Sequence, residues 1–459
     1  MNRTTATQRV EIVPILDEGL GNQSYVVALG DGRALVIDPS RDPLPYFEIA
    51  DRRSLQIAYA AETHLHADFI SGSRELAARG ATILAPAAAE LQAAHRGLKN
   101  GDEVDLGAGL RLRALATPGH TPEHLSYLLL DGDNPLALFS GGALIPGGAA
   151  RTDLIEPRQT EPLARALHQA VRRQLAGLPD ALSVYPTHGG GSFCSAGIGG
   201  DRTTTLGRER LMNPLLKTEN EDAFVRAFLG GLGTYPSYFR RLRAVNRQGA
   251  RLYGPRLPEL ARMSVDAVRH GLDTAATLID TRPYPEFASG QVPGALSIAL
   301  RPAFASWLGW IVPADRTLIF VMGPEQDRRD LVSQCLKVGY EKFLGELDGG
   351  MVAWRAAGLP ERTVTLRDVS DDLDPTVLDV RQQNEWDAGR LPGARHIELG
   401  SIRDANGLIP SGPLTIYCRH GDRAMTAASL LEATGHRTLA VLAGGFQAWS
   451  VAGRPVTLD

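Results

Sequence analysis

Residues 278–298, LIDTRPYPEFASGQVPGALSI, recur in similar form as residues 377–397, VLDVRQQNEWDAGRLPGARHI. A second pair of similar segments, LDGGMVAWRAAGLP at 347–360 and LAGGFQAWSVAGRP at 442–455, follows the first pair. Such self-similarity indicates two tandem copies of one structural unit. In each copy, strand-like apolar runs alternate with helical segments. This alternation predicts α/β domains with parallel sheets.

The composition is that of a globular protein with several domains. The 459 residues amount to about three domains at ~150 residues each. A net charge of −4 provides no basic field for nucleic acid or anionic lipid, and residues 1–14 lack the apolar core of a signal peptide. Three widely spaced cysteines favour a reducing compartment. We expect a cytoplasmic enzyme with no nucleic-acid or membrane partner, and the sequence leaves a homo-oligomer open.

The N-terminal half has a different pattern of strands and helices from that of the repeats. Residues 1–206 open with strand-like runs and then alternate strands with helices, which predicts two sheets covered by helices. Residues 207–261 are mostly helical and rich in arginine, and we expect them to form a connector that packs on the first domain. The two copies then form domains at 262–362 and 363–459.

Cys418 lies between an apolar strand and an amphipathic helix in the segment LTIYCRHGDRAM. A thiol in this position faces the free N–H groups of the loop and the positive end of the helix, and both favour thiolate over thiol. Four residues separate Cys418 from Arg423, whereas the phosphate-binding loop of protein phosphatases has five between its cysteine and arginine. The smaller loop suits a single terminal sulfur atom.

With LDVR, LPGA and GGFQAW, this loop resembles the rhodanese family of sulfurtransferases across the whole second copy. The resemblance implies that Cys418 is the nucleophile that accepts sulfane sulfur as a persulfide. It also implies that the loop cradles the persulfide and, through its arginines, holds an anionic donor. The loop residues are Arg419, His420, Gly421, Asp422 and Arg423. The implied partners are a small-molecule sulfur donor and a thiol acceptor, such as thiosulfate, a persulfide or glutathione.

In the first copy Met322 stands opposite Cys418 when both copies are aligned on Gly339 and Gly435. A thioether cannot carry a persulfide. Cys335 is expected inside the following helix as a buried core thiol. We therefore expect the first copy to be an inactive rhodanese domain. Its role would be to act as a spacer for the active copy, to dock it or to shape it.

The N-terminal domain carries candidate metal ligands in three turns that follow strand-like runs, ETHLHADFISG, TPGHTPEHLSYL and YPTHGGGSFCS. The candidates are His64, His66, Asp68, His120, His188 and Cys194. His124 begins a strand and is expected at the surface or behind the site. His95 and His168 are expected on helices, facing solvent.

In this order the motifs resemble the metallo-β-lactamase fold, an αββα sandwich, over about residues 8–245. HGGGSFC followed by TTLGRERLMNP resembles its persulfide dioxygenase branch. The resemblance implies one iron held by His64, His120 and an aspartate in a TGD turn. Three further residues would then lie behind the metal ligands or at the entrance of the family's active site. They are Asp68, His188 and Cys194. The chain is thus predicted to be an α/β multi-domain protein, a metallo-β-lactamase-like sandwich followed by two tandem rhodanese-like domains.

The implied metal site lacks its third ligand, and the sequence departs from the family pattern at three positions. Gly142 stands at the position of the aspartate, Gly148 at a second usual aspartate and Phe69 at another ligand position. Loss of the anionic ligand weakens an iron site of the two-histidine, one-carboxylate type. No tightly bound metal, one Zn(II) held by three histidines, and residual Fe(II) all stay open. The histidines of the zinc alternative are His64, His66 and His120.

Three functions remain as hypotheses. The favoured one is a sulfurtransferase of persulfide or thiosulfate metabolism that acts through Cys418. The second is an iron-dependent persulfide dioxygenase in which Cys418 supplies or consumes the persulfide. The third is a non-enzymatic persulfide sensor or carrier.

Overall fold

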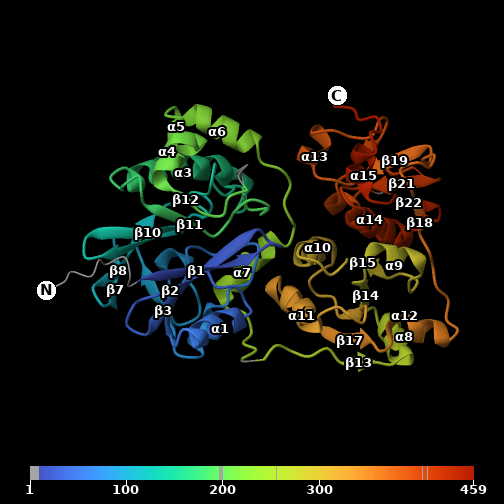
Figure 1. Cartoon of the computed structure of the whole chain (residues 1–459), viewed down its shortest axis with the longest axis horizontal. Helices are drawn as coiled ribbons and strands as arrows, with labels where there is room; N and C mark the ends of the chain where they lie inside the picture. The colour runs from blue at the N-terminus through green and yellow to red at the C-terminus, as the bar shows by residue number, and fades with distance from the viewer. Residues whose placement is uncertain (1–9, 196–199, 255, 406, 411, 459) are drawn as a thin grey trace. The chain divides into compact units, whose positions relative to one another are not determined.

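The computed structural model describes residues 10–195, 200–254, 256–405, 407–410 and 412–458. The chain divides into two compact units, one formed by residues 1–258 with 333–339, and the other by residues 259–332 with 340–459. Figure 1 shows the ribbon of each unit. Among the described residues, no helix has both the length and the apolar character needed to cross a membrane.

The N-terminal unit is built from two sheets, each with six strands in the described part of the chain. The first sheet has the order β1 (Glu11–Asp17), β2 (Asn22–Ala28), β3 (Arg33–Ile37), β4 (Gln56–Ala61), β5 (Thr82–Pro86) and β6 (Arg96–Leu98). The second has the order β12 (Thr204–Thr205), β11 (Ser183–Pro186), β10 (Asn134–Gly141), β9 (Leu125–Asp131), β8 (Leu110–Ala116) and β7 (Glu103–Gly107).

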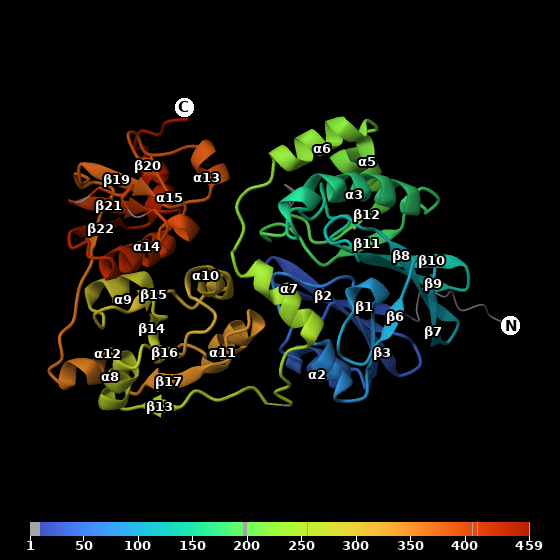
Figure 2. The same ribbon diagram turned by 180° about the vertical axis from the view of Figure 1, so that it is seen from behind.

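Helices cover the outer face of each sheet, so the layers follow the order predicted from the sequence (Figures 1 and 2). The first sheet carries α1 (Leu44–Arg52) and α2 (Ser73–Ala77). The second carries α3 (Thr160–Leu175), α4 (Leu206–Met212), α5 (Pro214–Lys217) and α6 (Glu221–Gly230). β9 lies between the inter-sheet core and the helical layer, which explains why six of its seven residues are buried.

The main core of this unit lies between the two sheets. Tyr25 and Leu35 project from the first sheet, and Leu129 and Phe139 from the second, and all four are fully buried. The Tyr25 hydroxyl donates a 2.6 Å hydrogen bond to the Pro186 carbonyl, which satisfies its polar group inside the core. The sheets are therefore held at a fixed spacing, and the loops at their edges start from fixed points.

The segment after α6 contains α7 (Phe239–Gln248), which holds the loop after β4. The Asn246 side chain donates to the carbonyls of His66 and Phe69, both at 2.8 Å, and accepts from the Ser71 N–H at 2.9 Å. One side chain of α7 thus holds the backbone after β4 at His66, Phe69 and Ser71.

After residue 261 the chain forms two successive copies of one α/β fold, which belong to the second unit except for residues 333–339. The first copy comprises β13 (Arg262–Met263), α8 (Val265–Asp273), β14 (Thr277–Asp280), α9 (Tyr284–Ser289), β15 (Leu296–Ser297), α10 (Phe304–Ile311), β16 (Leu318–Val321), α11 (Arg328–Lys337), β17 (Phe343–Leu347) and α12 (Gly350–Ala356). The second comprises β18 (Thr365–Arg367), β19 (Thr376–Asp379), α13 (Gln383–Asp387), β20 (Arg395–His396), β21 (Leu414–Tyr417), α14 (Asp422–Ala433), β22 (Leu439–Leu442) and α15 (Gly445–Val451).

The two sheets have the same strand order, β13-β17-β16-β14-β15 and β18-β22-β21-β19-β20, and every pairing in them is parallel. This confirms the predicted parallel sheets. The repeated Asp-x-Arg motif forms a buried ion pair after the second strand of each copy, Arg282 with Asp280 and Arg381 with Asp379, both at 2.6 Å. Each arginine also donates to a carbonyl eight residues further along. The motif therefore fixes the turn that follows the strand.

The first copy also packs on the second within this unit. α14 contacts β15 and α9, and residues 424–431 of α14 are all buried. The Thr426 hydroxyl donates to the Ser297 carbonyl at 2.6 Å, and the Ser297 N–H donates to the Ser429 hydroxyl at 3.1 Å. The helix that follows Cys418 is thus supported by both copies (Figure 2).

Asn246→Ala should release the 62–71 loop, because three hydrogen bonds to its backbone are lost. We expect a loss of about 1–3 kcal/mol in the free energy of unfolding and faster hydrogen exchange of the Ser71 amide. Gln248→Ala, at an exposed position of the same helix, is the matched control. An unchanged Ser71 exchange rate in the Asn246 variant contradicts this role.

Candidate functional site

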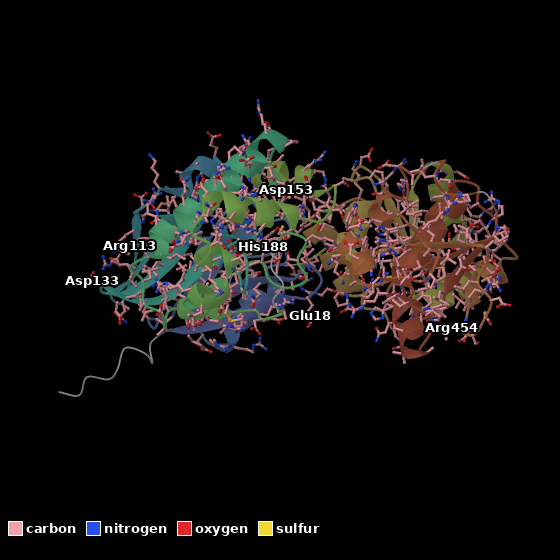
Figure 3. The ribbon with its side chains drawn as sticks, turned by 90° about the horizontal axis from the view of Figure 1, so that it is seen from above. Glu18, Arg113, Asp133, Asp153, His188 and Arg454 are labelled. Carbon is pink, nitrogen blue, oxygen red and sulfur yellow. The ribbon has the colours of Figure 1, made fainter. Side chains whose placement is uncertain are left out.

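Three histidines meet inside the N-terminal unit. His64 follows β4, His120 follows β8 and His188 follows β11, and each is at most 1% exposed. One ring nitrogen from each residue lies within 4.8 Å of the other two. His64 Nε2 and His188 Nε2 are 3.3 Å apart. Figure 3 shows His188 in the interior of this unit.

The second nitrogen of each ring has a partner of its own. His64 Nδ1 lies 2.8 Å from the Thr63 hydroxyl, and His120 Nδ1 lies 2.7 Å from the Arg151 carbonyl. His188 Nδ1 lies 3.0 Å from the side-chain oxygen of Asn22. Burial, followed by the neighbouring histidines, lowers the pKa of His120 and of His188 to about 3, and the pKa of His64 also falls well below its usual value. All three rings are therefore neutral near pH 7, the form that binds a metal.

His66 has a different environment. Its Nε2 lies 3.0 Å from a Glu62 carboxylate oxygen and 3.2 Å from Asp38. Burial by itself lowers the pKa of His66, but these two carboxylates outweigh it and raise the pKa to about 10. Phe69 stacks on the ring with centroids 4.2 Å apart. In this conformation His66 is a buried cation held by two carboxylates. It belongs to two groups that could hold a metal ion, one with His64 and Asp38 and one with Asp68 and His188, whereas His120 is grouped with His64 and His188.

The space expected for an aspartate at position 142 is filled by other groups. A Cβ atom on Gly142 would lie 2.8 Å from His120 Cδ2 and 2.9 Å from Ala150 Cβ. The Gly142 N–H donates to His124 Nε2 at 3.0 Å, so His124 lies behind the site and not at the surface. Gly142 thus supplies no carboxylate to His64 and His120. Three groups of side chains nevertheless lie close enough to hold a metal ion: His64 with His120 and His188, His64 with His66 and Asp38, and His66 with Asp68 and His188. These donors fit a cation that accepts imidazole ligands.

Asp68 and Cys194 lie beside the cluster. Asp68 accepts a 2.6 Å hydrogen bond from the Asn22 amide group and lies 3.6 Å from His188 Nδ1. Burial raises the pKa of Asp68, and burial together with the Asp68 carboxylate raises the pKa of the Cys194 thiol well above its usual value. Cys194 is fully buried. It is thus a protonated thiol near neutral pH and a poor nucleophile.

Two further sequence expectations are corrected by the structure. His168 was expected to face solvent, but it is 4% exposed and its Nε2 bonds the Thr218 carbonyl at 2.7 Å, because α6 covers this face of α3. His95 was expected on a helix, but it lies in an irregular segment before β6. The sequence did not identify Asp38 and Glu62 as partners of His66. Their only signal in the sequence is a carboxylate directly after a buried strand.

In the second unit Cys418 directly follows β21, and Gly421 N–H donates to its Sγ at 3.1 Å. Cys418 is 1% exposed, whereas the next two residues, Arg419 and His420, are exposed. The Cys418 carbonyl accepts from the Phe446 N–H at 2.7 Å, so the first turn of α15 forms one wall of the loop. Gly445, at φ +58°, is required there because a Cβ would lie 2.2 Å from the Cys418 carbonyl oxygen.

Arg423 is not available to bind an anionic sulfur donor. Its guanidinium makes two bonds to Glu385, at 2.6 and 2.9 Å. Burial disfavours the charged form of this arginine, but Glu385 and the nearby Cys418 raise its pKa overall. Arg423 therefore fixes the base of the loop against α13, and Arg419 and His420 remain at its mouth.

In the corresponding loop of the first copy, polar side chains bond the loop backbone. Met322 directly follows β16 and is 5% exposed. The next N–H, of Gly323, donates to the Gln326 side chain at 2.8 Å. Arg328 donates to three loop carbonyls and pairs with Glu346 at 3.0 Å. The loop thus has no thiol at the position of Cys418, the amide directly after Met322 is bonded to a side chain, and Cys335 is fully buried as expected.

The first copy also contributes side chains beside the Cys418 loop. A Cβ at Gly421 would lie 2.6 Å from the ring of Tyr284, whose hydroxyl accepts from the Gly444 N–H at 3.2 Å. Arg301 Nε lies 3.6 Å from an Asp422 carboxylate oxygen. Neither residue was recognised from the sequence, because contacts between the copies leave no local pattern.

Family models match these parts of the chain. The rhodanese-like domain model matches residues 264–357 and 364–452, and the metallo-beta-lactamase superfamily model matches residues 17–188. The chain belongs to the metallo-β-lactamase superfamily and carries two rhodanese-like domains. The expected family and fusion architecture are thereby confirmed.

Known relatives of the metallo-β-lactamase domain have different names. The chain is 36% identical to a hydroxyacylglutathione hydrolase of Methylobacillus flagellatus over 39% of its own length, and it spans 66% of that enzyme. It is 29% identical to the human mitochondrial persulfide dioxygenase ETHE1, over 43% of this chain and 74% of the relative. The crystal structure of a metallo-beta-lactamase from Staphylococcus aureus subsp. aureus COL aligns with 74% of this chain and 99% of its own, with 28% identity and a TM-score of 0.65.

Gly142→Asp should not simply restore a carboxylate ligand in the metallo-β-lactamase domain. The added side chain collides with His120 and Ala150, and we expect a loss of about 1–3 kcal/mol in the free energy of unfolding. The double variant Gly142→Asp/Ala150→Gly should recover part of this loss, because one of the two contacts is removed. Denaturant unfolding of the single and double variants measures the coupling between positions 142 and 150. Additive changes in the free energy of unfolding contradict the steric account.

Proposed function

We propose that this protein is a sulfurtransferase of persulfide or thiosulfate metabolism that carries sulfane sulfur on Cys418. The observation that supports the proposal most directly is the Gly421 N–H, which lies 3.1 Å from Sγ and donates to it. A hydrogen bond of this kind favours a thiolate over a thiol, and it can equally serve the outer sulfur of a persulfide.

The reaction needs no external oxidant. The Cys418 thiolate attacks the outer sulfur of thiosulfate, a new S–S bond forms, and the old S–S bond breaks with its electron pair leaving on sulfite. An acceptor thiolate or cyanide then attacks the terminal sulfur of the persulfide, and the Cys418 thiolate leaves. With a thiol acceptor, the product is a new persulfide.

The entrance of the Cys418 loop carries groups that suit an anionic sulfur donor. Arg419 and His420 are exposed there, and Arg301 of the first rhodanese-like domain lies near Asp422 with its side chain 37% exposed. Burial, then Arg419, lowers the pKa of His420, and Arg301 and Arg423 add to this effect. Since Arg423 is paired with Glu385, we assign Arg301 and Arg419 to the sulfonate end of thiosulfate or a carboxylate of a peptide persulfide.

The N-terminal domain supports sulfur chemistry as the context of this reaction, because one of its relatives is named a persulfide dioxygenase. Gly142 stands where the carboxylate of the iron ligand set is expected, so the domain lacks that ligand for oxygenation. His64, His120 and His188 are the residues that would hold a metal there.

Cys418→Ser should reduce thiosulfate:cyanide sulfur transfer to background, because a serine hydroxyl cannot form a persulfide. Cys335→Ala, which changes a buried thiol of the other copy, should retain turnover. Thiocyanate formation is the measurement. Undiminished turnover in the Cys418 variant refutes the assignment, and a wild-type protein that takes up one sulfur per chain without turnover supports a carrier instead.

Arg301→Gln should raise KM for thiosulfate about tenfold with little change in kcat, because a charge that meets the donor is lost while the nucleophile is intact. Arg301→Lys should restore part of the affinity. Arg269→Gln, on the exposed side of α8, is the matched control. Equal KM values for the Gln variant and the wild type contradict the assignment.

A further inference from the structure

The first rhodanese-like domain has a cleft at the position where the second domain carries Cys418. Figure 2 shows its neighbouring strands β17, β16 and β14. The chain continues from β14 to β15 on one side of the sheet and from β16 to β17 on the other. The boundary between β14 and β16 is therefore a topological switch point, and open α/β sheets bind ligands beyond the carboxyl ends of the strands there. A cleft of about 950 Å³ lies at this end of the sheet.

One wall of this cleft lies further from the strand loop than in the second copy. A Cβ on Gly445, in the first turn of α15, would lie 2.2 Å from the Cys418 carbonyl oxygen. A Cβ on the equivalent Gly350, in the first turn of α12, would lie 3.3 Å from the Met322 carbonyl oxygen. The first copy thus has more space between the loop after its central strand and the following helix.

The least exposed residues of the cleft are apolar. Met322, Leu347 and Met351 line it, and each is at most 5% exposed. Among the described residues that form its lining, none carries a thiol, a hydroxyl, an imidazole or an amine. A ligand in this cleft would therefore be bound without transfer of sulfur to a protein thiol.

The polar part of the lining is rich in arginine, with five arginines and three acidic residues. Two of the arginines are structural. Arg282 is paired with the buried Asp280 at 2.6 Å, and Arg328 with Glu346 at 3.0 Å, and both also bond backbone carbonyls. These two arginines shape the cleft, so a ligand must be met by the others.

Arg262 and Arg355 are placed to meet a ligand. Arg262 pairs with Asp348 and Arg355 with Glu361, both at 2.8 Å, and the arginine side chains are 67% and 45% exposed. Such exposed ion pairs are weak, because water screens both charges. Neither partner carboxylate belongs to the lining of the cleft. Each guanidinium group can therefore exchange its surface partner for a carboxylate of a ligand inside the cleft.

We propose that this cleft binds a short peptide with two carboxylates and one ammonium group. The carboxylates meet Arg262 and Arg355, the apolar part packs on Met322 and Met351, and the ammonium group meets Glu286, an exposed acidic residue of the same lining. The volume is within the range of small-molecule sites, ~300–1,000 Å³. The proposal is independent of sulfur transfer, because the cleft uses no group of the second copy.

The test uses S-methylglutathione as the probe, since this peptide has two carboxylates and one ammonium group but no thiol that could react with Cys418. Calorimetric titration of the full-length wild-type protein should show saturable binding. Arg262→Gln/Arg355→Gln should raise Kd at least about tenfold, because two charged contacts are lost. Arg262→Lys/Arg355→Lys should restore part of the affinity. Arg269→Gln, exposed on α8 and outside the lining, is the matched control.

Two further variants locate the binding site. Cys418→Ser should keep the wild-type Kd, which separates this cleft from the Cys418 loop. Glu286→Gln should raise Kd for the probe but leave Kd for its N-acetylated form unchanged, because that form has no ammonium group. The proposal is overturned by an absence of saturable binding at millimolar probe, by an unchanged Kd in the Gln double variant, or by loss of binding in Cys418→Ser.

Discussion

The N-terminal site depends on one buried carboxylate, Asp38, directly after β3. It accepts hydrogen bonds from the Thr63 N–H and from the hydroxyls of Thr63 and Thr187. Burial alone would raise the pKa of Asp38, but His66 and these donors lower it overall, so the carboxylate stays charged. Thr63 follows a strand of one sheet and Thr187 a strand of the other. One side chain therefore joins the two sheets and positions the residues that precede His64 and His188.

The two rhodanese-like domains show how one fold can keep its architecture and change its use. In both, a buried Asp-Arg pair fixes a turn and a loop follows the central strand. In the second domain a loop amide is directed at sulfur, and in the first the amide after Met322 is occupied by Gln326. The first domain nevertheless supports α14 and places Tyr284 and Arg301 beside the loop of the second. The first domain thus contributes packing contacts and a positive charge to the second.

Much of this organisation could be predicted from local patterns. The repeat at 278–298 and 377–397 predicted two parallel-sheet domains, because strand and helix periodicity and turn residues are local properties. The residues on each side of Cys418 predicted the loop for the same reason. The burial of His168 could not be predicted, since it depends on α6, a helix some fifty residues further along that packs on the same face of α3.

The sequence alone determined which residues bring chemistry to each site: a thiol after a strand in one copy, a thioether in the other, and histidines in three turns without an aspartate at position 142. Only the tertiary structure decided how these groups act. The protonation state of a buried histidine depends on what its two ring nitrogens meet. For His64, His120 and His188 those partners depend on Asp38, Arg151 and Asn22, which lie more than twenty residues away in the sequence and are brought near only by the packing of the two sheets.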